Sequence, residues 1–266
     1  MLDRAARRGT RALFADRVWP AVVEALGDRD SRLLIALDLD GTLAPIVSKP
    51  ESARVPAATL RLLERAARIP RVFIAVVTAR RRRDLDRLVP VRGIVRSAQY
   101  GLQGPLPLPA ARRRRLRAAA RRIAALLAPI AAKFEGAWIE AKDLTVAIHS
   151  RGVGRARVGA LRKEVAAISG AAARLGFAPI RGREVVEFAP RGAGKDHALR
   201  SIRRRVAPRV VFYFGDSVAD EPAFAILGAR DFSVRVGAGR TRARFRVRDH
   251  RDVSRVLRAL LSARAT

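Results

Sequence analysis

The chain has 266 residues, 49% of them hydrophobic, and a formal net charge of +31. This length is sufficient for one large domain or two smaller ones around a real hydrophobic core. The absence of cysteine excludes disulfides, thiolate metal sites and a cysteine nucleophile. The N-terminal residues lack the apolar core of a signal peptide, and no stretch approaches the ~18 apolar residues of a membrane span. We therefore expect a soluble, cytoplasmic protein that does not bind membranes.

The positive charge comes from 55 lysines and arginines against 24 acidic residues, but very few of the 55 are lysines. Because lysine codons are rich in A and T, this skew indicates the coding bias of a GC-rich genome. The arginines are scattered and lack the interleaved aromatic residues of single-strand binders. We expect no specific nucleic-acid partner, only weak, salt-sensitive binding of polyanions. A non-catalytic, basic polyanion-binding protein stays open as an alternative.

The first third of the chain alternates helices and strands. An amphipathic helix at residues 10–26, interrupted at Pro20, is predicted within an N-terminal helical extension (residues 1–30). The elements expected after it are a strand at 32–40, a helix at 56–69, a strand at 71–80 and a strand at 94–101. This alternation predicts a parallel sheet with helices on both faces and a ligand site at the carboxyl ends of the strands.

A glycine and three prolines at 102–109 break this rhythm and indicate a linker. The elements expected after it are an arginine-rich helix at 110–133, two strands within 137–150, a helix at 155–175 and two strands within 177–190. The strand at 209–216 and the final helix then resume the first pattern. We predict an α/β fold: a doubly wound parallel-sheet core (31–103 and 186–266) with an inserted α+β cap domain (104–185).

Polar residues end three of the predicted core strands. Asp38 and Asp40 follow the first strand, Thr78 ends the second and Asp216 follows a later one, while Lys195 begins a core helix. Because parallel strands share one carboxyl edge, we expect these side chains to converge. Mg²⁺ is the natural partner of such carboxylates, and a hydroxyl and an ammonium group suit a phosphate.

Two carboxylates near a phosphate can divide the chemistry between them. Asp38 is expected to attack phosphorus and form an aspartyl-phosphate, and Asp40 to act as general acid and then general base. A lone D-x-D is equally typical of a strand-end turn with solvated carboxylates. The four matched elements in chain order favour catalysis.

Four of these features together resemble the haloacid dehalogenase phosphohydrolases: D-x-D-G-T-L at 38–43, a hydroxyl ending the second strand, a lysine, and G-D-x-x-x-D at 215–220. Over residues 31–262 the chain is most similar to the trehalose-6-phosphate phosphatase family. The resemblance implies a phosphoric monoester hydrolase that uses Mg²⁺ to convert trehalose 6-phosphate to trehalose and phosphate. It also implies a mobile cap and trehalose-6-phosphate synthase as a pathway partner. Sucrose 6-phosphate, glucosylglycerol phosphate and mannosyl phosphate stay open as other sugar phosphate substrates.

The resemblance also assigns residues in the core. It implies a metal held by Asp38, the carbonyl of Asp40 and Asp216, with Asp220 supporting the metal through water in place of Ser217. Phosphate contacts are implied for three residues: Thr78, Lys195 and Gly41.

Sugar contacts are implied by the segments IEAKDLTVAIHSR (139–151) and EFAP (187–190), which are similar to the family's E-x-K…H-x-R and E-x-R-P. The substrate-binding residues assigned in this way are Glu140, Lys142, His149, Arg151 and Glu187, and Gln99 is added because Gln99-Tyr100-Gly101 stands where the family has Glu-His-Gly. The chain departs from the family pattern at Gln99, where a glutamate is usual, and at Ala189, where an arginine is usual. A surface ribbon with cross-strand Glu–Lys pairs is the structural alternative for the first segment, and His149 alone is typical of a structural histidine.

Overall fold

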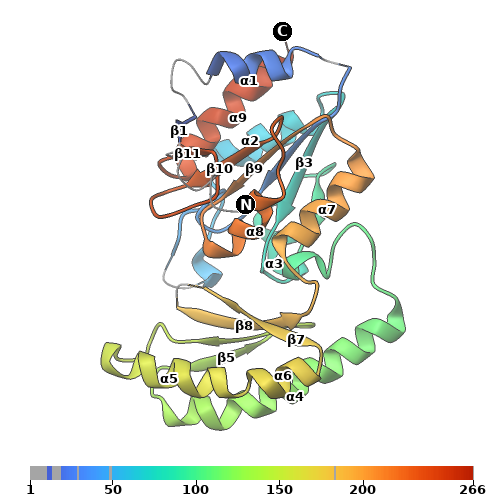
Figure 1. Cartoon of the computed structure of the whole chain (residues 1–266). Helices are drawn as coiled ribbons and strands as arrows, with labels where there is room; N and C mark the ends of the chain where they lie inside the picture. Colours follow the sequence, from blue (N-terminus) through green and yellow to red (C-terminus); the bar gives the residue numbers. More distant parts are fainter. Residues whose placement is uncertain (1–10, 14–18, 29, 48–49, 183, 266) are drawn as a thin grey trace, which may run out of the picture. The chain divides into compact units, whose positions relative to one another are not determined.

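The computed structural model describes residues 11–13, 19–28, 30–47, 50–182 and 184–265. The chain divides into two compact units, a core unit of residues 1–106 and 194–266 and a second unit of residues 107–193. Figure 1 shows the first as a sheet with helices and the second as a smaller sheet with its own helices. Both parts of the predicted fold class, a doubly wound parallel sheet and an inserted α+β unit, are confirmed.

The core unit contains a seven-stranded sheet in which every neighbouring pair of strands is parallel. In sheet order the strands are β1 (Arg11–Ala12), β11 (Phe245–Val247), β10 (Phe232–Val236), β9 (Val210–Gly215), β2 (Leu33–Leu37), β3 (Val72–Val77) and β4 (Val95–Ser97). Strand β2 lies between β3 and β9, so three central strands end side by side. This order places the segments after β2, β3 and β9 at one edge of the sheet.

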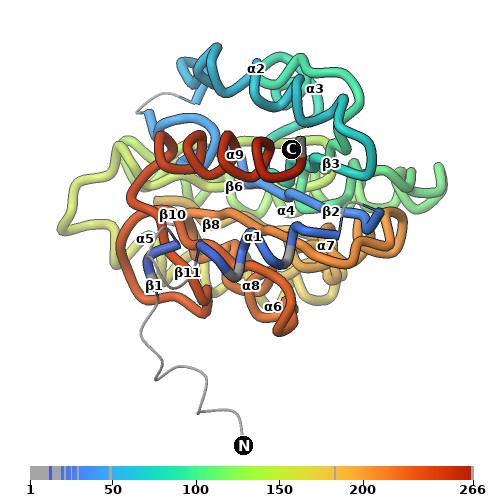
Figure 2. Tube along the Cα trace, turned by 90° about the horizontal axis from the view of Figure 1, so that it is seen from above, coloured from blue at the N-terminus to red at the C-terminus, as the bar shows by residue number. Residues whose placement is uncertain are grey.

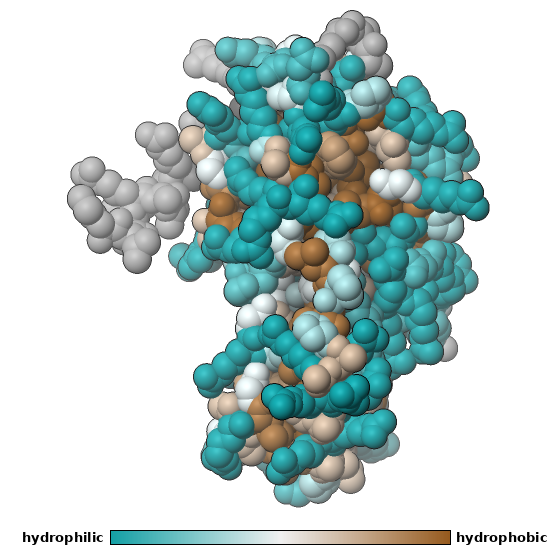
Figure 3. Space-filling model, turned by 90° about the vertical axis from the view of Figure 1, so that its right-hand side faces the viewer, coloured by the Kyte–Doolittle hydropathy of each residue, from teal (hydrophilic) through white to brown (hydrophobic). Residues whose placement is uncertain are grey.

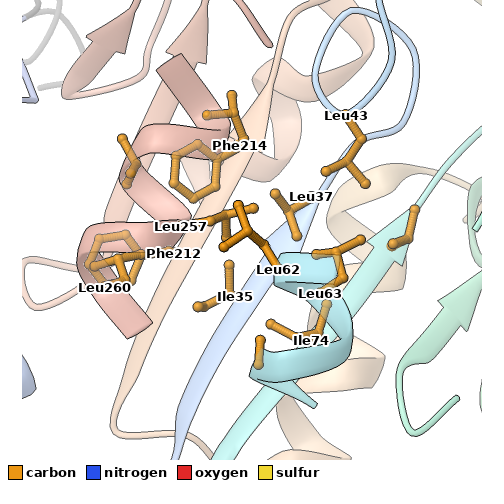
Figure 4. Packing of buried hydrophobic residues seen from close by; sticks show 14 of the residues in the cluster. Ile35, Leu37, Leu43, Leu62, Leu63, Ile74, Phe212, Phe214, Leu257 and Leu260 are labelled. Carbon is orange, nitrogen blue, oxygen red and sulfur yellow. The ribbon is translucent and has the colours of Figure 1, made fainter. Parts of the chain in front are cut away.

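Helices cover both faces of this sheet. All five residues of β2 are apolar and buried, so each face of the strand must pack against other elements. Leu33, Ile35 and Leu37 pack toward α2 (Ala57–Ala66) and α9 (His250–Ala265). Figure 4 shows side chains of β2, β9, α2 and α9 meeting there.

The opposite face of the sheet has its own hydrophobic cluster. Leu34 and Ala36 of β2 join buried residues of α7 (Lys195–Val206) and α8 (Glu221–Ala225). Figure 2 shows α2 and α9 on one side of the strands and α7 and α8 on the other. The remaining helical segments of this unit are α1 (Trp19–Leu26), η2 (Pro50–Ser52), α3 (Arg82–Leu88), η3 (Gln99–Gly101) and η4 (Val218–Asp220).

The start of the chain differs from the prediction of one helix over residues 10–26. Residues 11–12 form β1, which pairs with β11, and the helix α1 covers only Trp19–Leu26. Residues 1–10 and 14–18 lie outside the described part of the chain. Pro20 is the second residue of α1, where its missing N–H has no helical acceptor to lose. The described residues of the predicted extension therefore include a strand of the core sheet.

Strand β11 was also missed by the sequence analysis. Its three residues lie among arginines, so no apolar run marks it. The buried side chains of Ala243, Phe245 and Val247 do alternate with arginines, and this period of two is the signal that could have revealed the strand.

The second unit contains a four-stranded antiparallel sheet in the order β5-β6-β8-β7. Its strands are β5 (Trp138–Ala141), β6 (Val146–His149), β8 (Val185–Pro190) and β7 (Phe177–Arg181), and its helices are α4 (Ala110–Lys133), α5 (Arg155–Ala167) and α6 (Ser169–Arg174). Figure 1 shows these helices on one face of the sheet. The predicted boundary between residues 185 and 186 falls inside β8 and assigns most of that strand to the core. Because β8 pairs with β6 and β7, the unit extends to Ala193.

The second sheet has two chemically different faces. Val146 and Ile148 of β6 and Phe188 of β8 are buried against the helices. Neighbouring positions on the same strands carry His149 and Glu187, and successive side chains point to opposite faces. We call the side that carries Trp138, Glu140, Ala147, His149 and Glu187 the polar face of the second sheet.

Within the described residues, no helix is both long and apolar enough to cross a bilayer. Figure 3 shows hydrophilic side chains over much of the drawn surface of each unit. Apolar side chains are concentrated in the three buried clusters instead.

The packing of α9 against the sheet gives a stability prediction. Leu257 is fully buried, so Leu257→Ala should lower the free energy of unfolding by about 2–5 kcal/mol, through lost burial and a residual cavity. Val23→Ala on α1, where the side chain is 43% exposed, is the matched control and should change it by less than ~0.5 kcal/mol. Urea unfolding monitored by circular dichroism measures both. Equal effects would contradict this account of the core.

Candidate active site

Three carboxylates gather at the carboxyl edge of the core sheet. Asp38 follows β2 and Asp216 follows β9, and these strands are neighbours in the sheet. The main-chain N–H of Asp38 donates to the carbonyl of Phe214 at 2.9 Å, which continues the strand pairing into the site. One carboxylate oxygen from each of Asp38, Asp216 and Asp220 lies within 4.8 Å of the other two. The predicted convergence of Asp38 and Asp216 is thus present in the geometry.

Lys195, the first residue of α7, is buried among these carboxylates. Its Nζ lies 2.8 Å from Oδ1 of Asp38 and 2.8 Å from Oδ1 of Asp220. Asp220 also accepts hydrogen bonds from the hydroxyl of Tyr213 at 2.8 Å and from the N–H and Oγ of Ser217 at 3.0 and 2.6 Å. These four donors occupy the lone-pair sites of the Asp220 carboxylate, so direct ligation of a metal by Asp220 would break one of these bonds.

Burial is the main cause of the altered pKa values here. It raises the pKa of Asp38 well above its ordinary range, with Lys195 opposing the shift. Burial also raises the pKa of Asp216 to about 6, where Lys195 opposes and Asp220 adds to the shift. Burial alone would lower the pKa of Lys195, but the charges of Asp220 and Asp38 outweigh it and raise that pKa. Lys195 therefore keeps its charge throughout the physiological range.

The cluster fits a divalent cation on electrostatic grounds. Three carboxylates face one ammonium group, and the raised pKa values of Asp38 and Asp216 reflect the cost of holding negative charge in a buried site. A hard cation with oxygen ligands would offset that cost. Asp38 and Asp216 are the two cluster members whose carboxylates are best placed to hold it, because the Asp220 carboxylate is committed to its four donors.

Two glycines allow the carboxylates to approach the main chain closely. Gly41 adopts φ +78°, and a Cβ on it would lie 2.0 Å from Oδ2 of Asp216. A Cβ on Gly215 would lie 2.2 Å from Cγ of Asp220. The glycine of the D-x-D-G segment therefore makes room for the Asp216 carboxylate as well as supplying a left-handed turn.

Asp40 lies apart from the acidic cluster and pairs with Arg80. Nε and Nη2 of Arg80 each donate to one carboxylate oxygen of Asp40 at 2.7 Å, and the Asp40 side chain is 41% exposed. A third bond, from Nη1 of Arg80 to the carbonyl of Pro50 at 2.9 Å, fixes the guanidinium. The sequence analysis missed this arginine, although it stands two residues after Thr78.

Thr78 follows β3 at the same edge and is buried. Its Oγ1 accepts a hydrogen bond from the N–H of Arg80 at 3.1 Å. The next segment contains Gln99 and Tyr100, which have φ of 46° and 56°. Consecutive left-handed residues other than glycine are uncommon and store strain. The side chain of Gln99 has no exposed surface, so its predicted sugar contact would require this segment to move.

Four of the five sugar-binding residues predicted in the second unit form one network on its polar face. Nζ of Lys142 lies 2.9 Å from both carboxylate oxygens of Glu187, and Oγ1 of Thr145 donates to Glu187 at 2.5 Å. Nε2 of His149 lies 3.2 Å from Oε2 of Glu140, which is 3.9 Å from Lys142.

The fifth predicted residue, Arg151, pairs with Glu184. Its Nε donates to Oε2 of Glu184 at 2.8 Å, and both side chains are largely exposed. Trp138, which the sequence analysis did not single out, does belong to the polar face and stacks on His149.

A doubly wound parallel sheet carries Asp38, Thr78, Lys195 and Asp216 at its carboxyl edge, and an α+β unit is inserted after its edge strand β4. This arrangement defines a haloacid dehalogenase fold. The Trehalose-phosphatase family profile matches residues 36–251. The chain belongs to this trehalose-phosphatase family.

Individual relatives agree with this assignment. The chain is 31% identical over 237 residues to the bifunctional trehalose-6-phosphate synthase/phosphatase of Thermoproteus tenax, covering 86% of this chain and 32% of that protein. It is 31% identical over 232 residues to the trehalose-phosphate phosphatase of Mycobacterium ulcerans, covering 82% and 58%. A crystal structure of a trehalose-6-phosphate phosphatase related protein superposes with a TM-score of 0.72 at 27% identity, covering 86% of this chain and 97% of that one. The chain thus spans between about a third and three fifths of the length of these curated relatives.

The raised pKa of Asp216 gives a pH prediction for the metal-free protein. The folded-state pKa of Asp216 is about 6 and its ordinary value is 3.8. Protonation of Asp216 therefore stabilises the folded protein, fully below about pH 4, and this stabilisation is lost as the pH rises through about 6. D216N removes this dependence. Between about pH 5 and pH 7.5, the unfolding free energy of D216N should therefore rise relative to wild type by roughly 1–2 kcal/mol.

Urea unfolding of both proteins in EDTA, at the two pH values, measures this difference. If it stays constant or falls with pH, Asp216 is ionised in the folded metal-free protein near its ordinary pKa.

Proposed function

We propose that this protein is a Mg²⁺-dependent phosphatase that hydrolyses trehalose 6-phosphate to trehalose and phosphate. The observation that carries the proposal is the cluster of Asp38, Asp216 and Lys195 at one sheet edge, in which Asp38 and Lys195 are buried and Asp216 is partly buried. The chain matches the trehalose-phosphatase family over residues 36–251. The names of the relatives in Thermoproteus tenax and Mycobacterium ulcerans support the choice of sugar phosphate.

In this proposal Asp38 and Asp216, together with the carbonyl of Asp40, hold the Mg²⁺. The ion supplies positive charge that keeps Asp38 ionised and neutralises the phosphate oxygens. Lys195, with its raised pKa, adds a fixed positive charge that contacts both Asp38 and an incoming phosphate. Thr78 and the main chain at Gly41 complete the phosphate contacts.

The proposed reaction has two displacements at phosphorus. First, a carboxylate oxygen of Asp38 forms a bond to phosphorus while the bond to the sugar oxygen breaks, and Asp40 donates a proton to that oxygen. Then water, deprotonated by Asp40, attacks the aspartyl-phosphate, and phosphate leaves with Asp38 regenerated. The two bonds from Arg80 hold the Asp40 carboxylate in one orientation, so Arg80 is the positioning residue of the acid/base group.

The sugar is proposed to bind the polar face of the second unit. Glu187 and Lys142 form a buried ion pair there, with Glu140 beside it. Carboxylates and an ammonium group fixed in this way suit the hydroxyls of a disaccharide, because each can take part in two hydrogen bonds. We further propose that the protein acts in the cytoplasm, where a trehalose-6-phosphate synthase supplies its substrate. The fusion of both activities in the name of the Thermoproteus tenax relative supports that partner.

The deciding experiment is phosphate release from a panel of sugar phosphates by the purified protein. With Mg²⁺ we expect trehalose 6-phosphate to give the highest kcat/KM, above sucrose 6-phosphate, glucosylglycerol phosphate and glucose 6-phosphate. EDTA should stop the reaction and Mg²⁺ restore it, because the carboxylate cluster needs the cation. Preference for another member of the panel would reassign the substrate, and no release from any member would favour a non-catalytic binding protein.

The division of labour between the two aspartates gives a further prediction. Asp38→Asn should abolish turnover, because an amide neither attacks phosphorus nor neutralises the cation. Asp40→Asn should lower kcat by about 10²–10⁴-fold while the Mg²⁺ dependence stays close to that of wild type. Steady-state phosphate release across Mg²⁺ concentrations measures both. Loss of Mg²⁺ affinity alone in Asp40→Asn would make Asp40 a ligand and not the acid/base group.

A further inference from the structure

Trp138 is an exposed aromatic side chain on the polar face of the second sheet. Its relative exposure is 44%, and among the described residues it is the one aromatic side chain in the set of exposed large hydrophobic side chains. It begins β5 and stands two residues before Glu140, so both side chains lie on the same face of the strand. An exposed indole costs free energy in water, which gives reason to look for what it binds.

The indole is held rigidly by its cross-strand neighbour. Trp138 is paired in register with His149, and the two rings stack with centroids 3.8 Å apart and planes at 6°. Nε2 of His149 in turn lies 3.2 Å from Oε2 of Glu140. The imidazole of His149, held by Glu140, therefore covers one face of the Trp138 indole. The Glu140 carboxylate stands on the same side of the strand as the indole.

A flat apolar ring beside fixed polar groups matches the chemistry of a pyranose. A glucose ring has C–H groups on its two faces and hydroxyls around its rim. One face can therefore pack against an aromatic ring while the hydroxyls donate hydrogen bonds to carboxylates. Glu140 lies next to Trp138, and the Lys142–Glu187 pair lies beyond Glu140 on the same face. All of these groups belong to one unit, so their mutual placement does not depend on the core.

We propose that Trp138 is a specificity-determining residue whose outer ring face binds a glucose ring of the substrate. The inference rests on the proposed function and deepens it, because it names the apolar contact through which a disaccharide is preferred over a small phosphate ester. His149 acts through Trp138 as a positioning residue. The alternative role of Trp138 is a cross-strand pair that only stabilises the edge strand β5.

The first experiment detects sugar binding without catalysis. The chain has two tryptophans, so Trp19→Phe leaves Trp138 as the one tryptophan reporter. Its emission should change saturably when this variant is titrated with trehalose, and should not change with the open-chain polyol sorbitol. A flat response to trehalose, or an equal response to both, overturns the proposal.

The second experiment separates binding from folding. Trp138→Leu keeps apolar bulk but loses the ring plane, so KM for trehalose 6-phosphate should rise about tenfold with kcat nearly unchanged, because the lost contact is present in ground and transition states alike. Trp138→Phe should restore most of the affinity. Leu126→Ala, an exposed apolar position on α4 of the same unit, is the matched control and should leave KM unchanged.

Hydrolysis of p-nitrophenyl phosphate, which has no sugar, should be the same in all of these variants. Equal losses on both substrates in Trp138→Leu, or an unchanged KM for trehalose 6-phosphate, would assign Trp138 to strand stability alone. Failure of the proposed function is a distinct result, since wild type would then release no phosphate from trehalose 6-phosphate. The fluorescence titration with trehalose would still decide whether Trp138 binds the sugar.

Discussion

The two ion pairs of Lys195 connect the first residue of α7 to Asp38, which follows β2, and to Asp220, which lies beyond β9. One ammonium group at the start of α7 lies 2.8 Å from carboxylates that follow β2 and β9. Removing one partner of a buried pair leaves an uncompensated charge and costs about 3–5 kcal/mol. The lysine therefore fixes the end of one helix against two strands, and the same charge is available to a phosphate. Structure and proposed reaction depend on one contact.

Around this contact, the acidic residues fall into two groups with different environments. Asp38 is buried and Asp216 is partly buried, and desolvation raises the pKa of each, although Lys195 opposes the shift. Asp40 stands outside the cluster and is matched by a bidentate arginine. Asp220 has its four acceptor sites filled. In the proposed mechanism the same functional group serves as cation ligand in Asp38 and Asp216 and as proton carrier in Asp40, whereas in Asp220 four hydrogen-bond donors make it a structural anchor.

Much of the core site could be predicted from the sequence because one rule governs it. Parallel strands end at one edge, so the polar residues that end the predicted strands at 32–40, 71–80 and 209–216 were expected to converge. Asp38 and Asp216 do converge, whereas Asp40 pairs with Arg80 outside the cluster. The pair of Asp40 and Arg80 could not be found in this way, because the rule says which strand ends lie together and not which side chains pair across them. Strand β1 was missed because two residues carry too little periodicity, and β11 because its alternation of apolar side chains with arginines was not recognised. The role of Asp220 depends on Tyr213, whose hydroxyl direction no pattern reveals.

The second unit is one uninterrupted segment, residues 107–193, placed inside a core that is assembled from both ends of the chain. Only two peptide junctions connect them, and every strand pair of the core sheet is formed without it. Substitutions in this segment can therefore accumulate without altering the register of a single core strand. Under the proposed function, replacement of this one segment at its two junctions would change the substrate-binding surface and leave the acidic cluster of the core as it is.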